Sequence, residues 1–294
     1  MTPMRIGIIG GTGQMGRWFQ RFFVDLGHSV LIAGRKTTLT YHELARQSDL
    51  VILSAPLNAA ISIAKSIGPE MTEKQALMDV CSQKEEIVHC MERCTAAQVL
   101  GTHPLFGPSM DSIVGQNVVF CPARGETWAH RLQSVFQENG AVVTRMSPED
   151  HDKQMAVVQG LTHLLTVAMG RTLEKMTLSP ESARNVSTPI FRVNLDFIGR
   201  LLGQDLGLYA DLIGKNRYLG EALGIFMESM AEGRDILTRA DGGKPLPDKE
   251  TSVAYLGGIR DFFGRFCDEG MEESDGILNR LFVDSRDSWK PESR

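Results

Sequence analysis

The sequence predicts an α/β domain followed by an all-α helical domain, and two observations lead to this prediction. Over residues 1–148, short β-like runs alternate with helical stretches, which favours βαβ units and a mostly parallel sheet. Over residues 149–294 these runs vanish, and long helical periods of apolar and polar residues replace them. A length of 294 residues with 42% apolar residues is enough for two domains of ordinary size.

The expected strands of the first domain are short apolar runs bounded by turn residues. They cover 5–9, 29–33, 50–55, 76–79, 98–100, 117–120 and 141–144. Pro56 stops the third of them, because proline cannot donate to a strand ladder. A helix is expected over 15–26, where apolar residues recur at helical spacing.

The composition excludes several classes of protein. The chain has 31 Lys and Arg against 36 Asp and Glu, and a net charge of -5 argues against nucleic acid as the main partner. No stretch approaches the ~18 uninterrupted apolar residues of a membrane span. Residues 1–5 lack the pattern of a signal peptide, and five cysteines without disulfide-like spacing suit a reducing compartment. We therefore expect a cytoplasmic, enzyme-sized protein.

A glycine loop follows the first expected strand and opens the first expected helix. In such a loop the first glycine permits a tight turn, the second lets the backbone approach a pyrophosphate, and the third lets helix and strand pack closely. A purely structural glycine turn is the alternative, but the position within a βαβ unit favours a Rossmann-type dinucleotide-binding domain. The residues of the loop are Gly11, Thr12, Gly13, Gln14, Met15 and Gly16.

The turn after the second strand indicates which dinucleotide is bound. A site for NAD places Asp or Glu there to accept from the ribose 2′-hydroxyl, whereas here no acid stands between the second strand and Glu43. Arg35 can instead meet a 2′-phosphate through its planar fork, so the sequence favours NADP over NAD; a solvated surface turn is the alternative. The predicted cofactor site comprises the glycine loop together with Arg35, Lys36, Thr37, Ser54 and Pro56.

A histidine loop, Gly101–Pro108, follows another expected strand. The carboxyl edge of a doubly wound sheet is where ligands bind, and few rotamers are open to a histidine held between a strand and a Pro/Gly-rich loop. The ordinary pKa of histidine, ~6.5, suits proton abstraction near neutral pH. His103 is therefore a candidate base, and a hydrogen-bonding scaffold residue is the alternative.

Four motifs follow one another along the sequence, namely Gly11-x-Gly13-x-x-Gly16, Asp79-Val-Cys-Ser82-Gln-Lys84, His103-Pro-Leu-Phe-Gly107 and Ile198-Gly-Arg200. This is the order seen in the prephenate dehydrogenases of tyrosine biosynthesis, and the sequence resembles that family over most of its length. The similarity extends through two further segments around residues 149–152 and 189–192.

This resemblance implies oxidative decarboxylation of prephenate to 4-hydroxyphenylpyruvate, with hydride transfer to NAD(P). His103 matches the catalytic histidine that accepts the proton of the ring hydroxyl. Ser82 matches a serine that hydrogen-bonds both this histidine and the substrate hydroxyl. Arg200 matches an arginine that binds a substrate carboxylate, and Arg192 matches a neighbouring arginine. The resemblance also implies a homodimer formed by the helical halves, with apolar helices after residue 205 as the surface.

Gln159 and His163 are further candidates for the substrate site. Both lie on a polar face of small residues in the first long helix of the second domain, and the family often has a histidine in this helix. A hydrogen-bonded histidine between helices is the alternative for His163. Arg192, Asp196 and Arg200 stand at i, i+4 and i+8, so a surface salt-bridge stripe is the alternative for the two arginines.

Other residues are assigned simpler roles. His151 is interpreted as part of a helix start with acids in its first turn, not as a catalytic residue. No metal site is expected, because Cys90 and Cys94 with His89 match no common zinc spacing. The Met-rich segment 226–230 is interpreted as core packing.

Several alternatives for the function remain open at this stage. Arogenate and an aminodeoxy analogue differ from prephenate at one side group, and no single residue decides among the three substrates. A β-hydroxyacid dehydrogenase has a lysine base on a helix, for which no clear match stands out. A non-catalytic NADP-binding regulatory module has no need of Ser82, His103 and Arg200 together. Some members of the family carry a mutase or regulatory domain. A glycine loop at residue 11 and a short polar tail after 284 lead us to expect neither here.

Overall fold

The computed structural model describes residues 2–238 and 248–287, with side chains described as far as residue 281. The chain divides into two compact units, Met1–Val158 and Gln159–Arg294, called the first and the second unit below. Among the described helices, none is both long enough and apolar enough to cross a membrane.

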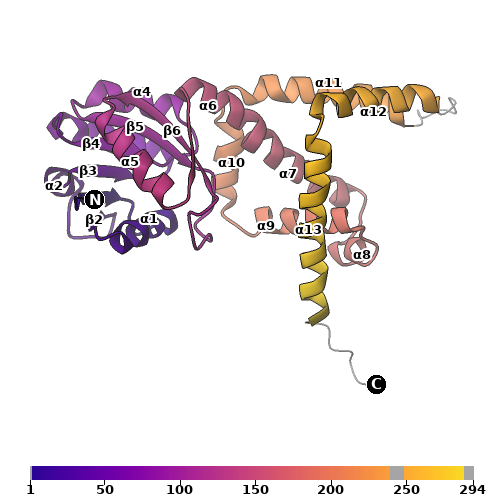
Figure 1. Ribbon diagram of the computed structural model, residues 1–294, viewed down its shortest axis with the longest axis horizontal. Helices are drawn as coiled ribbons and strands as arrows, with labels where there is room; N and C mark the ends of the chain where they lie inside the picture. The colour runs from indigo at the N-terminus through magenta and orange to yellow at the C-terminus, as the bar shows by residue number, and fades with distance from the viewer. Residues whose placement is uncertain (1, 239–247, 288–294) are drawn as a thin grey trace. The chain divides into compact units, whose positions relative to one another are not determined.

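The first unit is built on a seven-stranded sheet of order β2-β1-β3-β4-β5-β6-β7 (Figure 1). The strands β2, β1, β3, β4 and β5 run parallel to one another, β6 is antiparallel to β5, and β7 is parallel to β6. The predicted α/β class is confirmed. The bounds are β1 Arg5–Ile9, β2 Ser29–Ala33, β3 Leu50–Leu53, β4 Ala76–Asp79, β5 Gln98–Pro104, β6 Asn117–Arg124 and β7 Val142–Arg145.

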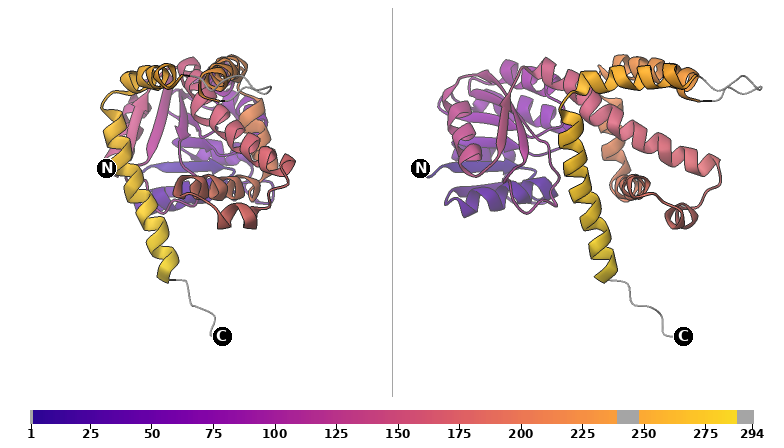
Figure 2. Two further views of the ribbon diagram at one scale, coloured as in Figure 1. Left: turned by 90° about the vertical axis from the view of Figure 1, so that its right-hand side faces the viewer. Right: turned by 45° about the vertical axis from the view of Figure 1, so that its right-hand side comes forward.

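Helices cover both faces of this sheet, as Figure 2 shows from two further sides. Aromatic side chains of α1 (Gln14–Asp25) and α5 (Thr127–Glu138) form the core on one face, where Phe19 and Phe136 are fully buried. The other face is packed by α2 (Tyr41–Gln47), α3 (Leu57–Ile67) and α4 (Glu85–Cys94), with the short 3₁₀ turn η1 (Gly68–Glu70) after α3. Because both faces are covered, all four residues of β3 are buried, which is why the central strands are continuous apolar runs.

Helix α6 (Pro148–Met155) packs with the first unit, which extends to Val158. The domain boundary after residue 148 stays a prediction. The helix begins as its sequence indicates, since the Ser147 hydroxyl accepts from the Asp150 N–H at 3.0 Å and Pro148 occupies the first turn. Its Asp152 carboxylate accepts from the N–H groups of Lys84 and Glu85, at 2.8 and 3.0 Å. These bonds tie α6 to the start of α4, a contact over a long sequence separation that no local pattern indicates.

The second unit is entirely helical over its described residues, as predicted. A π-helical segment, η2 (Ala156–Leu161), joins α6 to α7. A π-helix winds more residues into each turn than an α-helix, so the 3.6-residue period that placed Gln159 and His163 on one face does not hold through η2. The helices that follow are α7 Thr162–Lys175, α8 Pro180–Asn185, α9 Pro189–Leu202, α10 Leu206–Gly214, α11 Leu219–Leu237, α12 Lys249–Phe263 and α13 Phe266–Asp287.

Much apolar surface of the second unit is exposed. Helices α11 and α12 run side by side in all three views (Figures 1 and 2), yet Ile225 on α11 and Phe262 on α12 are 60% and 85% exposed. Met227 and Met230 are also more than half exposed, so the interpretation of the Met-rich segment as core packing is wrong. Large exposed apolar surfaces in a protein mark interaction sites.

Candidate active site

The glycine loop has the geometry of a phosphate-binding turn. Gly10 has a φ of +88°, and its N–H donates to the carbonyl of Ala33 at 2.8 Å, which fixes the turn at the end of β1. A Cβ on Gly16 would lie 2.3 Å from the Gly10 carbonyl oxygen, so a side chain there would displace backbone. Helix α1 begins after Gly13 with no side-chain cap and no acid in its first turn. An uncapped, unblocked helix start of this kind fits the phosphates of a dinucleotide.

The turn after β2 presents two cations. Arg35 and Lys36 are exposed in it. The Thr37 hydroxyl bonds within the turn, accepting from the Gly34 N–H at 2.9 Å and lying 3.0 Å from the Gly34 carbonyl oxygen. Thr37 therefore shapes the turn that presents Arg35.

The carboxyl ends of the parallel strands bring several predicted site residues to one edge of the sheet. Ser54 follows β3, Asp79 ends β4 and His103 lies near the end of β5, and these three strands are consecutive in the sheet. Because Asp79 is in register with Gly101, His103 stands beyond that pair at the same edge as Ser82, in the turn after β4. This is the edge at which doubly wound sheets bind ligands.

His103 lies inside β5, whereas the sequence placed it in the loop after the strand. The strand continues to Pro104 because β6 pairs with it antiparallel, with His103 opposite Val119. The side chain is 3% exposed. Burial, together with the charges of His151 and Lys84, holds the pKa of His103 well below its ordinary value of 6.5. The imidazole of His103 is thus neutral at physiological pH.

A chain of hydrogen bonds runs from His103 into α6. The Nδ1 atom of His103 lies 2.9 Å from Nε2 of His151, and Nδ1 of His151 lies 2.7 Å from Oδ1 of Asp152. His151 is fully buried. The cap of α6 is Ser147, so the role of His151 is not the helix start that its sequence context suggested. The sequence offered one signal, an Asp directly after a histidine, which is too common to predict this contact.

A buried ion pair stands beside this chain. The Lys84 ammonium bonds the Asp79 carboxylate, and both side chains are fully buried. The same carboxylate accepts from the Cys81 N–H at 2.8 Å, which shapes the turn that carries Ser82. Burial raises the pKa of Asp79, and the Lys84 charge opposes this shift. Sequence reasoning missed the pair, although an acid at the end of an otherwise apolar strand, as in 76–79, is a usable signal of a buried charge.

The predicted substrate-binding residues belong to the second unit, whereas His103 and Ser82 belong to the first. Arg192 Nε lies 3.2 Å from Asp196 Oδ2, so the first half of the expected salt-bridge stripe is formed, and Asp196 pairs with Arg192. Arg200 is exposed on the same helix, α9. His163 on α7 packs edge to face on Tyr209 of α10, with ring centroids 5.1 Å apart, and burial lowers its pKa. Gln159 lies in η2 and is half-buried.

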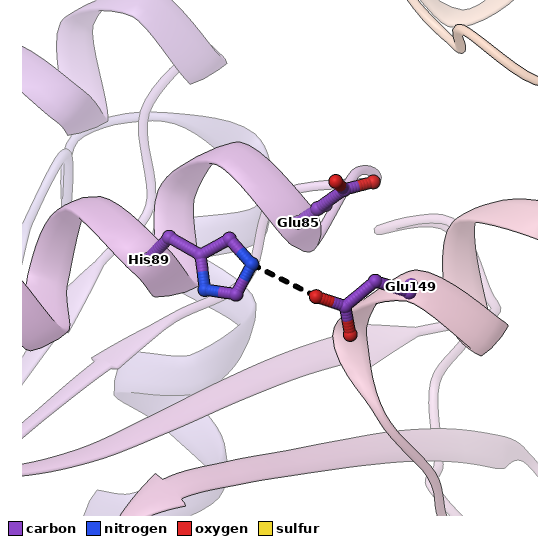
Figure 3. A group of neighbouring side chains, drawn as sticks. All are labelled: Glu85, His89 and Glu149. Carbon is purple, nitrogen blue, oxygen red and sulfur yellow. Dashed lines mark hydrogen bonds and ion pairs between the residues drawn. The ribbon is translucent and has the colours of Figure 1, made fainter.

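Three part-exposed side chains form a further polar cluster in the first unit, drawn in Figure 3. Their donor atoms all lie within 4.8 Å of one another. Ring nitrogens of His89 lie 2.8 Å from Glu149 and 3.4 Å from Glu92, so this group is a hydrogen-bonded joint between α4 and α6. The third side chain of the cluster is Glu85.

Cys94, at the end of α4, does not belong to this cluster. Its thiol donates to the Ala64 carbonyl at 3.2 Å, and burial raises the pKa of the thiol to about 11.

Comparison with known families matches both halves of the chain. The family model described as the prephenate dehydrogenase nucleotide-binding domain matches residues 32–145. The model described as the prephenate dehydrogenase dimerization domain matches residues 147–244. The two matches meet near residue 146, close to the boundary predicted from the sequence.

Individual relatives agree with these matches. A probable arogenate/prephenate dehydrogenase of Methanocaldococcus jannaschii is 32% identical over 82% of this chain, and the T-protein of Haemophilus influenzae is 30% identical over 94%. The chain spans 58% of the first relative's length and 71% of the second's. A crystal structure of prephenate dehydrogenase from Aquifex aeolicus, with hydroxyphenyl propionate and NAD+, superimposes with a TM-score of 0.69 at 22% identity, covering 88% of this chain and 97% of that one.

Proposed function

Because the chain belongs to the prephenate dehydrogenase family, we propose that it catalyses the oxidative decarboxylation of prephenate to 4-hydroxyphenylpyruvate with a nicotinamide dinucleotide. The observation that carries the proposal is the pairing, within one unit, of a phosphate-binding glycine loop with a buried neutral histidine at the carboxyl edge of the sheet. The glycine loop, Arg35 and the end of β3 would hold the dinucleotide, whose nicotinamide accepts the hydride when bound.

His103 is the proposed catalytic base. A carbinol carbon that loses hydride becomes a carbonyl only if its hydroxyl proton also leaves, so a base must stand within about 3 Å of that hydroxyl. The buried, neutral imidazole of His103 has the lone pair that this step requires. In this proposal Ser82 donates to or accepts from the same hydroxyl and so orients it.

Loss of carbon dioxide then completes the reaction without a further catalyst. The electron pair of the broken carbon–carbon bond moves into the ring, which becomes aromatic, and the former carbonyl oxygen becomes a phenolate. This oxygen takes back the proton that His103 holds, so the histidine returns to its neutral form and no net proton is released. Prephenate is a dianion, and Arg200 with Arg192 would bind its carboxylates.

An assay of nicotinamide reduction with prephenate tests the proposal directly. We expect turnover with prephenate, and absorbance of the reduced nicotinamide should rise in proportion to the 4-hydroxyphenylpyruvate formed. Absence of turnover with prephenate but activity with arogenate would keep the reaction class and correct the substrate. Arogenate is the second candidate because the relative from Methanocaldococcus jannaschii is a probable arogenate/prephenate dehydrogenase. If neither substrate led to nicotinamide reduction, the result would favour a nucleotide-binding module without catalysis.

We propose NADP as the preferred dinucleotide, and Arg35→Ala tests this preference. If Arg35 forks a 2′-phosphate, its loss removes a hydrogen bond between charged groups, worth about 1.5–3 kcal/mol. The KM for NADP should then rise roughly 10- to 100-fold while the KM for NAD stays constant. Arg21→Ala, at an exposed arginine on α1, is the matched control. Equal changes for both dinucleotides would show that Arg35 belongs to a solvated turn.

The pH dependence of kcat/KM should reflect the lowered pKa of His103. The groups that face it are His151 and Lys84, whose charges lower this pKa along with burial, and Asp152 beyond His151. A base with a lowered pKa stays unprotonated to lower pH, so kcat/KM should remain level as the pH falls through 6.5 and decline only below it. An acid limb with its midpoint at or above 6.5 would contradict the assignment.

We also propose a homodimer in the cytoplasm. Exposed apolar residues on α11, α12 and α13, among them Phe262 and Met271, supply surface suited to pairing, and the matched family domain is described as a dimerization domain. All five cysteines are free thiols, which agrees with a reducing compartment. Light scattering tests the assembly, and a monodisperse monomer at micromolar concentration would reject it.

A further inference from the structure

The chain His103–His151–Asp152 contains more polar chemistry than the fold of the first unit requires. His151 is fully buried and Asp152 is 7% exposed, and burying a histidine and a carboxylate in an apolar setting costs free energy unless each is bonded. Asp152 also bonds the N–H groups of Lys84 and Glu85 at the start of α4, but these bonds do not require a histidine at position 151. The cap of the helix is already supplied by Ser147.

The positions of the protons in this chain follow from its carboxylate end. Burial alone would raise the pKa of Asp152, but hydrogen bonds from His151 and from the N–H groups of Glu85 and Lys84 hold it below its ordinary value. The carboxylate is therefore ionised and can only accept. The His151 Nδ1 atom, 2.7 Å away, must carry the proton that bridges them.

The same reasoning extends to the next ring. Burial lowers the pKa of His151, so this ring is neutral and holds one proton, which is already on Nδ1. Its Nε2 atom is then an acceptor, and the Nδ1 atom of His103, 2.9 Å away, must be the donor. A neutral His103 with its proton on Nδ1 carries its lone pair on Nε2.

We propose that His151, oriented by Asp152, is a positioning residue that fixes His103 in the tautomer whose Nε2 atom acts as the base. This role rests on the proposed function, because it assigns the nitrogen that takes the substrate proton. When His103 gains that proton, its Nδ1–H still donates to His151, and the Asp152 carboxylate stabilises the resulting charge through the intervening ring. His151, between the base and the carboxylate, would hold the base in one tautomer and orientation, as the aspartate does directly in a Ser-His-Asp triad.

Two substitutions of His151 separate this role from simple packing. The amide of His151→Gln reaches the place of Nε2 and can accept from His103, whereas the amide of His151→Asn reaches only the place of Nδ1 and leaves His103 without its acceptor. His151→Gln should retain most of the wild-type kcat. His151→Asn should lose kcat by about 10- to 100-fold, as is typical when an outer partner of a functional histidine is removed, with the dinucleotide Kd unchanged.

His89→Gln is the matched control. His89 also joins α4 to α6, through Glu149, but it stands outside the His103–His151–Asp152 chain. Its replacement should lower the unfolding temperature slightly and leave kcat unchanged. Equal losses of kcat in His151→Gln and His151→Asn would overturn the proposal, because the acceptor at Nε2 would then be irrelevant.

Nitrogen-15 NMR of the imidazole rings decides the tautomers without any assay of activity. Two-bond nitrogen–proton correlations on the labelled wild-type protein at neutral pH should show His103 and His151 both protonated at Nδ1, with signals assigned from the spectra of His103→Asn and His151→Gln. A His103 ring protonated at Nε2 would overturn the proposal even if the variants misfold. If the wild-type protein turns over neither prephenate nor arogenate, the proposed function fails while the spectrum still reports the tautomer.

Discussion

Replacing His103 by Asn is expected to lower kcat by about 10²- to 10⁴-fold, the usual contribution of a general base. The substrate hydroxyl would then have no group to take its proton, so hydride departure would build positive charge on the carbon. The KM for the dinucleotide should change little, because the phosphates are held by the glycine loop after β1. Steady-state kinetics with prephenate, together with dinucleotide binding followed by fluorescence, measure both quantities.

The control for this variant is His130→Asn. His130 is an exposed histidine on α5 that lies 3.4 Å from Glu126 and has no proposed role in the active site. It should leave both kcat and dinucleotide affinity at wild-type values. If His103→Asn kept its activity, His103 would be a scaffold residue and the base would have to be sought elsewhere. If it lost dinucleotide binding as well, the variant would have disturbed β5 and the result would not support a role in proton transfer.

Asp79→Asn is expected to destabilise the first unit by about 3–5 kcal/mol, the usual cost of leaving one partner of a buried ion pair uncompensated. Asn can still accept from the Cys81 N–H, so the turn is preserved and the change isolates the charge. The Lys84 ammonium would remain with no counter-charge on Asp79 and shielded from bulk solvent, because its side chain is fully buried. Urea unfolding followed by tryptophan fluorescence reports on this core, where Trp18 and Trp128 are buried.

The double variant Asp79→Asn with Lys84→Met is the matched comparison. It removes both charges while keeping the length of the lysine side chain, so it should recover most of the stability lost in the single variant. Replacing a buried ion pair by uncharged groups of similar volume is often neutral or stabilising. A single variant that lost less than about 1 kcal/mol would contradict the prediction, because the Lys84 charge would then have to be solvated.

Local patterns in the sequence were sufficient for the architecture of the first unit. The runs at 5–9, 29–33 and 76–79 are strands with those bounds in the structure, because strands of a sheet covered by helices on both faces are mostly apolar. The glycine spacing from Gly11 to Gly16 is equally local, since backbone contact within a few residues decides it. The change of texture near residue 148 correctly indicated an all-helical second unit, although α6 packs with the first one.

Local sequence patterns could not predict which residues contact the candidate base. His103 was recognised as a candidate, but its place inside β5 depends on pairing with β6, and its bond to His151 joins residues 48 positions apart. The π-helical segment η2 likewise interrupts the regular helical period from which Gln159 and His163 were predicted to share a face. Sequence periodicity assumes one regular helix, so an insertion of wider turns is invisible to it.

The sequence alone thus determined the elements, the dinucleotide loop and the identity of one candidate base, because these rest on interactions between residues close along the chain. Only the tertiary structure showed that His151 contacts that base and which acid and lysine are buried beside it. These contacts depend on Asp152, Lys84 and Asp79, which the fold brings together from α6, the start of α4 and the end of β4. Burial and hydrogen bonding fix protonation, and both are properties of the packed chain.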